Sequence, residues 1–146
     1  MKKWVIFTIV IIIAVSGCIH SFPIEGFSFN DEKGQCTSKE SSNAEMTLAE
    51  NKIKFSGYVI TSTPCHELEA SYSIEKVELV KAPNTDIITI TIKEKTVGPG
   101  CVECLGEIPF NGEITINKEM WSGGGNYGIS IVYKDKELAR VFNYVT

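Results

Sequence analysis

From Lys52 onward, apolar residues recur at every second position of the chain. The clearest run is Ile88, Ile90 and Ile92, where isoleucine alternates with threonine and lysine. Alternation with period two puts one kind of side chain on each face of a strand, so one face can be buried while the other contacts water. Similar runs occupy residues 53–59, 68–74, 110–116 (interrupted by Asn111-Gly112), 127–133 and 138–144. Strands at this spacing, with no long helical pattern between them, predict an all-β, antiparallel β-sandwich.

A short motif narrows the predicted architecture. Gly123-Gly124-Gly125-Asn126 runs directly into a predicted strand that begins at Tyr127. This motif resembles the start of the sixth strand of immunoglobulin-like domains, where a glycine-containing turn precedes a tyrosine whose hydroxyl bonds back to the corner. The alternative is a loop before an ordinary strand whose tyrosine belongs to the core. We expect an immunoglobulin-like sandwich in which Tyr127 is buried.

The N-terminus has the features of an export signal. Lys2 and Lys3 precede the segment Trp4–Val15, which is apolar except for Thr8. A short positive region followed by an apolar run of this length is typical of such signals. The uncharged segment from Trp4 to Ile19 has only 16 residues, whereas a helix that crosses a bilayer needs about 20.

The end of this signal, Val15-Ser16-Gly17-Cys18, resembles the lipobox of prokaryotic lipoproteins. In that family an apolar residue and two small residues precede a cysteine that receives diacylglycerol and becomes the first residue of the mature chain. The resemblance implies lipidation of Cys18 and attachment to the extracytoplasmic face of the cell membrane. The alternative is an uncleaved signal anchor in which Cys18 is an incidental thiol. Either way the body of the chain is outside the cytoplasm.

These features predict the organisation of the chain. We expect residues 1–17 to be the signal peptide, residues 18–51 a lipidated tether and linker, and residues 52–146 the β-sandwich domain. Within the linker, Thr37–Asn43 is polar, and Ala44–Glu50 could form one or two helical turns.

Four cysteines remain in the mature chain: Cys36, Cys65, Cys101 and Cys104. An even number in an exported domain indicates two disulfides, for which three connectivities exist. On a strand, Cys101 and Cys104 would point to opposite faces and would seek different partners. We therefore favour Cys65–Cys101 and Cys36–Cys104 over a bond within the pair, and each should contribute about 2–4 kcal/mol.

Part of the body resembles a group of small, mostly uncharacterised secreted prokaryotic β-domains. The resemblance rests on Thr63–Ala70 with its Pro-Cys-His strand opening, the strand Ile87–Glu94, the opening Gly98-Pro99-Gly100-Cys101, and Pro109-Phe110. The layout is also weakly similar to the small domain of bacterial protease-stability-complex proteins. These resemblances imply a common β-fold and a cysteine bond between the Cys65 and Cys101 strands, but no activity.

Cys65, His66, Cys101 and Cys104 could instead form a Cys₃His metal site, since Cys101 and Cys104 have a zinc-knuckle spacing. Soft thiolates would also suit copper(I). Thiols of an exported chain tend to pair, however, and Cys65 and His66 would point to opposite faces of a strand. We expect disulfides here, no cofactor, and His66 as a surface or hydrogen-bonded residue at a strand start.

Enzymatic motifs find little support in the sequence. Thioredoxin-like redox pairs begin a helix, but Gly106 and Pro109 follow the Cys101–Cys104 pair too closely for one. A serine-based triad would depend on His66, because the second histidine is His20, beside the anchor. The glycine run lacks the lysine and helix of a phosphate-binding loop. Carboxylates alternate with apolar residues and indicate solvated strand faces; they are Glu67, Glu69, Glu75 and Glu78.

The charge balance restricts the possible partners. Without Lys2 and Lys3, the mature chain has 12 basic and 18 acidic side chains, and its single arginine is Arg140. No basic cluster exists to release counterions, so nucleic acid and anionic lipid are not expected as partners. Trp121, next to Met120, could be an exposed binding aromatic or could cover the end of the core.

Together these observations predict a non-enzymatic, membrane-anchored lipoprotein that binds or scaffolds an unidentified extracytoplasmic protein or ligand. Two alternatives are a zinc- or copper-binding lipoprotein and an inhibitor or accessory subunit of an envelope protease, the latter on fold analogy alone.

Overall fold

The computed structural model describes residues 24–79, 82–95, 98–117 and 126–143. Within these ranges the chain contains strands and no helix, which confirms the all-β prediction, and it offers no helical segment that could span a bilayer. The strands are β1 (Ile24–Asp31), β2 (Gln35–Cys36), β3 (Asn43–Ala49), β4 (Lys52–Thr61), β5 (Glu67–Leu79), β6 (Ala82–Lys95), β7 (Gly106–Ile116), β8 (Tyr127–Tyr133) and β9 (Lys136–Asn143). The predicted signal, Cys18, His20, Trp121 and the glycine run lie outside the described residues.

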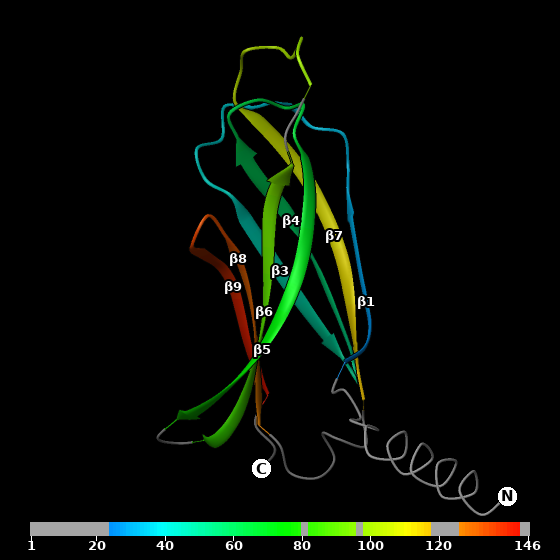
Figure 1. The fold of residues 1–146 in the computed structure, drawn as a ribbon, viewed down its shortest axis with the longest axis vertical. Helices are drawn as coiled ribbons and strands as arrows, with labels where there is room; N and C mark the ends of the chain where they lie inside the picture. The colour runs from blue at the N-terminus through cyan, green and yellow to red at the C-terminus, as the bar shows by residue number, and fades with distance from the viewer. Residues whose placement is uncertain (1–23, 80–81, 96–97, 118–125, 144–146) are drawn as a thin grey trace, which may run out of the picture.

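The strands form two sheets that face each other (Figure 1). The first has the order β1-β7-β4-β3, with β2 also pairing with β7, and the second has the order β5-β6-β8-β9. Every pair is antiparallel except β6 with β8, which is parallel. The expectation of purely antiparallel sheets is wrong for this pair. The chain leaves the second sheet after β6, runs back through the first sheet as β7, and returns as β8, so β6 and β8 point the same way.

The two sheets bury a core rich in isoleucine. On β6 the predicted inner-face residues Ile88, Ile90 and Ile92 are at most 1% exposed. Every second residue of β4, β7 and β8 faces them; these residues include Ile53, Phe55, Val59, Ile108, Phe110, Ile114, Ile129 and Ile131. Each such side chain stabilises the fold by about 1.5–3 kcal/mol relative to an exposed position. The alternation of apolar and polar residues therefore predicted correctly which face of these strands is buried.

The sheet begins earlier than the sequence predicted. Residues 18–51 were expected to be a tether and linker, but from Ile24 the chain belongs to the first sheet. β1 pairs with β7 from Ile24 opposite Ile116 to Asp31 opposite Phe110. Of the predicted tether, residues 18–23 lie outside the described residues.

The helical turns expected over Ala44–Glu50 are strand β3 instead. Ala44 is buried, Met46 packs against the core and Leu48 is partly exposed. These residues have high helix propensity, but the apolar ones occur at every second position, as in a strand. The backbone of β4 pairs with them along the whole of β3. Tertiary pairing overrides the local preference.

The Asn111-Gly112 pair does not interrupt β7, which runs unbroken from Gly106 to Ile116. A β-carbon on Gly112 would lie 2.2 Å from Cζ of Phe55 and 2.5 Å from the carbonyl oxygen of Ser28. Glycine is required here because the Phe55 ring lies over the backbone of the neighbouring strand.

Tyr127 is 4% exposed and shares the inner face of β8 with Ile129 and Ile131, so its predicted burial is confirmed. The glycine run that would form the corner lies outside the described residues.

Candidate functional site

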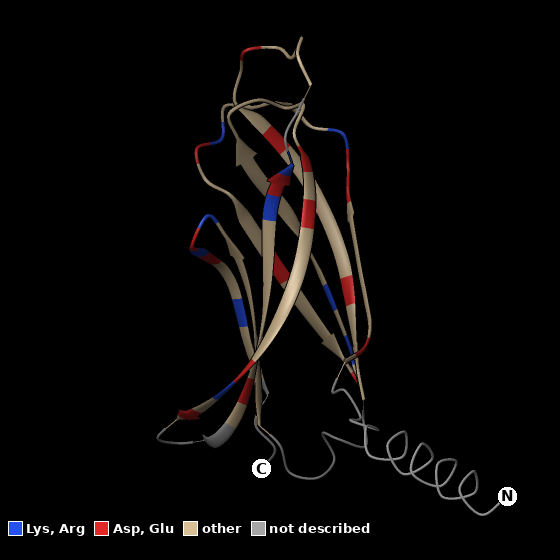
Figure 2. Ribbon diagram, viewed as in Figure 1, with Lys and Arg blue, Asp and Glu red and all other residues tan. Residues whose placement is uncertain are grey.

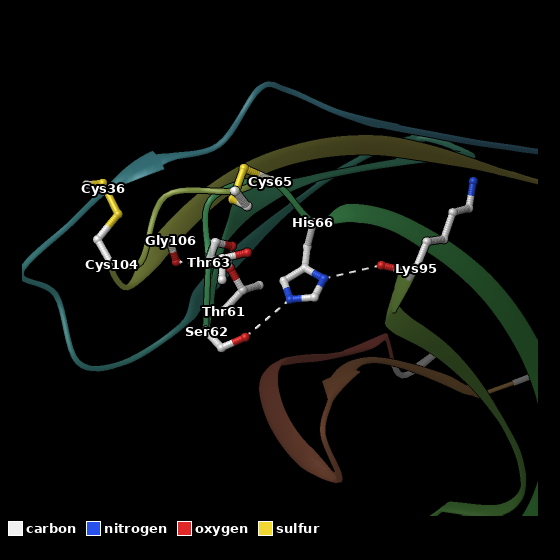
Figure 3. Close-up of a disulfide and its surroundings, with 10 residues drawn as sticks. Cys36, Thr61, Ser62, Thr63, Cys65, His66, Lys95, Cys104 and Gly106 are labelled. Atoms are coloured by element: carbon white, nitrogen blue, oxygen red, sulfur yellow. Dashed lines mark hydrogen bonds between the residues drawn. A yellow bond between two sulfur atoms is a disulfide. The ribbon is translucent and has the colours of Figure 1, made fainter. Parts of the chain in front are cut away.

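Both disulfides lie at the same end of the two sheets (Figure 3). Cys36 on β2 is bonded to Cys104, with 5.7 Å between their α-carbons, and Cys65 is bonded to Cys101, with 6.0 Å between theirs. These are the favoured pairs. The expected placement of Cys101 and Cys104 on a strand is wrong, because both belong to the loop between β6 and β7.

Glycine allows the segment between β4 and β5 to fold tightly against this end. A β-carbon on Gly106 would lie 2.5 Å from the backbone of Pro64, and one on Gly34 would lie 2.2 Å from its carbonyl oxygen. The hydroxyl of Thr61 donates to the carbonyl of Thr63 at 2.5 Å, which closes the turn after β4. Pro64 is thus packed between the backbones at Gly34 and Gly106. This packing fixes the position of the neighbouring residues Cys65 and His66.

His66 lies directly before β5 and is hydrogen-bonded through both ring nitrogens, as predicted (Figure 3). Nδ1 is 3.2 Å from the carbonyl oxygen of Lys95. Because a carbonyl can only accept, Nδ1 carries a hydrogen, and Nε2 of the neutral ring accepts from the Ser62 hydroxyl at 3.2 Å. Nε2 also lies 3.6 Å from Oε2 of Glu94, which would pair with a protonated ring.

Glu94 joins this histidine to a second polar group at the end of β8. Lys134 Nζ lies 2.7 Å from Oε1 of Glu94, and the Tyr133 hydroxyl donates to the same oxygen. Burial by itself raises the pKa of Glu94, but the hydrogen bonds from Lys134 and Tyr133 outweigh it and hold the pKa below its ordinary value. Glu94 is therefore an ionised carboxylate at neutral pH.

The pKa values of the two partners of Glu94, Tyr133 and Lys134, are shifted in the opposite direction. Burial and the bond to Glu94 raise the pKa of Tyr133 to about 12. The hydrogen bond to Glu94 likewise raises the pKa of Lys134. Both groups keep their protons at neutral pH, so Glu94 and Lys134 form an ion pair to which the Tyr133 hydroxyl adds a hydrogen bond.

Sequence reasoning did not single out Glu94 or Tyr133. A signal existed, because Glu94 continues the inner-face series Ile88, Ile90 and Ile92. A carboxylate at a position that the alternation assigns to the core needs partners. The Tyr133 hydroxyl supplies one of them and could not be placed opposite Glu94 without the three-dimensional pairing of β6 with β8.

Two grooves meet at His66. One, of about 750 Å³, lies between β1–β2 and the start of β5, and the other, of about 510 Å³, lies beside the end of β6. The first is lined by Asp31, Glu32, Lys33, Gly34, Gln35, Cys36, Pro64, Cys65, His66, Glu67 and Val102. The second is lined by Ser62, Thr63, His66, Glu94, Lys95, Gly98 and Cys101. The disulfide-bearing end thus carries two grooves, and another, of about 440 Å³, lies over the first sheet beside Glu45, Lys54 and Glu113.

The four residues of the alternative metal site do not form one here. The sulfurs of Cys65, Cys101 and Cys104 are in disulfides, which leaves His66 as the single available donor of that set. In the part of the chain that the structure describes, no group of three or more histidine, cysteine, aspartate or glutamate residues could hold a metal ion.

The Ser62–His66 hydrogen bond differs from that of a catalytic triad. In a triad the carboxylate holds Nδ1 and leaves Nε2 to the serine. Here Nδ1 is held by a backbone carbonyl, and Nε2 faces both Ser62 and Glu94. The arrangement orders the surface between the two grooves, and we assign it no catalytic role.

Comparison of the chain with protein-family models, curated proteins and solved structures finds no match.

Proposed function

We propose that this chain is a lipid-anchored, extracytoplasmic binding module that presents its disulfide-bearing end away from the membrane. The observation that supports this proposal is the position of the grooves relative to the start of the first sheet. Ile24 pairs with Ile116 at one end of β7, whereas Cys36 pairs with Gly106 at the other. β7 has 11 residues, so these ends are about 35 Å apart.

The predicted anchor is close to the Ile24 end. Five residues of chain lie between Cys18 and Ile24, and the six steps from one α-carbon to the next span about 20 Å when fully extended. A lipid on Cys18 would therefore hold the Ile24 end near the bilayer. The disulfides, His66 and both grooves would face outward, where a partner can reach them.

In this proposal the fold is an immunoglobulin-like sandwich, a scaffold that commonly displays binding loops at one end. The facing sheets and the buried Tyr127 support it. The parallel β6–β8 pair departs from the antiparallel sheets of that fold. The disulfides support an oxidising compartment.

The proposal is tested with the full-length chain in its own membranes. A photo-reactive amino acid replaces Val102, which is 63% exposed at the grooved end, or Leu48, which is 38% exposed near the Ile24 end. We expect a protein or ligand adduct from position 102 and none from position 48. The identity of the adduct also tests the envelope-protease alternative.

Two results would contradict the proposal. One is equal labelling from both positions, which would show that the grooved end has no special role. The other concerns the anchor: Cys18→Ser should abolish processing or release the protein from membranes, so normal processing with unchanged membrane attachment would exclude lipidation.

A further inference from the structure

Strand β5 is a long edge. It has 13 residues and, within the described part of the chain, pairs with β6 alone. An edge strand has unpaired N–H and C=O groups along its outer side, and these can pair with a strand from another chain.

One hydrogen bond identifies which residues face outward. The Leu68 N–H donates to the Asp31 carboxylate at 2.7 Å, and Asp31 belongs to the first sheet. The Leu68 N–H therefore points away from β6. Because residues two apart in an antiparallel ladder point their backbone groups the same way, Ala70, Tyr72 and Ile74 also present their N–H and C=O groups to the outer edge.

Both ends of this edge are protected against pairing. Asp31 occupies the outward N–H at Leu68. At the other end, Lys76 occupies an inner-face position, and the register with β6 shifts between Val77 and Leu79. Inward charges and strand irregularities are common ways in which proteins block edge pairing. The stretch from Ala70 to Ile74 contains no charge and no proline.

The same stretch also exposes apolar side chains. Tyr72 is 41% exposed and Ile74 is 36% exposed, although both lie on the face that is buried at Leu68. The ring of Tyr72 is 5.2 Å from that of Phe27 on β1. Unpaired backbone and exposed apolar side chains thus occur together on a segment of five residues.

Two observations bear on what could occupy this edge. An antiparallel pair of two β5 strands would point the grooved ends of the two copies in opposite directions, whereas the proposed function has every grooved end face away from the membrane. Charge also selects the occupant. Acidic residues occur along β5 (Figure 2), and the alternation of the strand places Glu69 and Glu75 on its outer face. Lys93 lies opposite Glu69, but Ile87 lies opposite Glu75. A basic side chain on an added strand would complement Glu75.

We propose that β5 binds an extended segment of a partner protein as an added strand along Ala70–Ile74, with apolar side chains over Tyr72 and Ile74 and a basic side chain beside Glu75. The choice of a partner over a second copy rests on the anchoring in the proposed function. Main-chain hydrogen bonds supply the affinity, and the alternate side chains supply the selectivity.

The test uses the full-length chain in detergent and a nine-residue peptide in which valine alternates with lysine and threonine. We expect saturable binding and slower hydrogen exchange of the Tyr72 and Ile74 amides. Ile74→Lys, which puts a charge on the inner face of the edge, should weaken binding at least tenfold. The matched variant Leu48→Lys, on the exposed edge strand β3, should not change it.

A second pair of variants separates backbone pairing from side-chain contact. Tyr72→Ala and Tyr72→Pro both remove the ring, but only proline also removes the outward N–H, and it breaks no bond to β6. We expect Tyr72→Pro to bind more weakly than Tyr72→Ala by about tenfold.

Any of three binding results would overturn the inference: equal binding by the two Tyr72 variants, a loss of binding in Leu48→Lys equal to that in Ile74→Lys, or equal binding of a peptide whose valines are gathered at one end. A fourth result concerns the oligomeric state. Dimerisation of the chain that Ile74→Lys abolishes would identify a second copy as the occupant and would exclude a partner strand. Each of these results is independent of the Val102 adduct and of Cys18→Ser, so this inference and the proposed function can fail separately.

Discussion

The Tyr133 hydroxyl lies within hydrogen-bonding distance of two acceptors, the Glu94 carboxylate and the carbonyl oxygen of Ile60, the latter at 3.1 Å, and shares its one hydrogen between them. These two bonds join β8 to β6 in its own sheet and to β4 in the opposite sheet. A single hydroxyl thus links both sheets at the grooved end of the molecule.

Removing this hydroxyl should destabilise the fold. Tyr133→Phe keeps the ring in the core but leaves Glu94 and the Ile60 carbonyl with one donor fewer, at a cost of about 1–3 kcal/mol. Denaturant unfolding measures the loss. The control is Tyr72→Phe at a 41% exposed position, which should change stability by less than about 0.5 kcal/mol. Equal effects would show that the Tyr133 bonds carry no net stability.

Glu94 should make the stability of the fold depend on pH in the acidic range. Its pKa is lower in the folded chain than in the unfolded one, so its contribution is complete above the ordinary glutamate pKa and is lost as pH falls through the folded value. Glu94→Gln should therefore be less stable than wild type near pH 7, and the gap should shrink as pH falls below about 4.5. Unfolding midpoints across this range measure the gap. A gap of constant size would contradict the assignment of Glu94 as an ionised group.

The disulfide pairing can be checked directly. Digestion without reduction should yield the linked peptides Cys36–Cys104 and Cys65–Cys101. Replacing either pair by serine should cost about 2–4 kcal/mol, because the unfolded chain gains conformational freedom. A Cys101–Cys104 linked peptide as the main product would exclude the observed pairing and restore the redox interpretation of that pair.

Gly112 should tolerate no side chain. Gly112→Ala would place a β-carbon within 2.2 Å of the Phe55 ring and 2.5 Å of the Ser28 carbonyl oxygen, which should cost about 1–3 kcal/mol through overpacking. Gly98→Ala is the matched control, because nothing lies within 4 Å of its β-carbon position. Thermal or denaturant unfolding of both variants gives the comparison, and equal midpoints would contradict the close packing of Phe55 on β7.

Much of the candidate site depends on residues that the sequence marked for other reasons. The cysteines, His66 and the exposed glutamates of β5 were found by residue type and spacing, and the structure brings the cysteines and His66 to one end. The contact between His66 and Glu94 was not predictable, because the two residues are 28 positions apart in the sequence and the alternation assigned Glu94 to the core. The position of β5 at the edge of the described second sheet could not be predicted from the sequence either. Whether a strand lies at an edge depends on which strands pair with it and not on its own sequence.

The sequence by itself determined where most strands lie and which of their faces is buried. Alternation over residues 53–59 and 88–92 is a local property, and burial of one face follows from it. Over residues 68–74 the same alternation buries Leu68 but leaves Tyr72 and Ile74 exposed. The tertiary structure decided what each strand pairs with. Ala44–Ala49 became a strand because β4 provides a partner for it, and β6 and β8 became parallel neighbours because β7 crosses to the other sheet between them. Pairing satisfies backbone hydrogen bonds between residues far apart in the chain, so it is determined by the closure of the whole fold and not by any single segment.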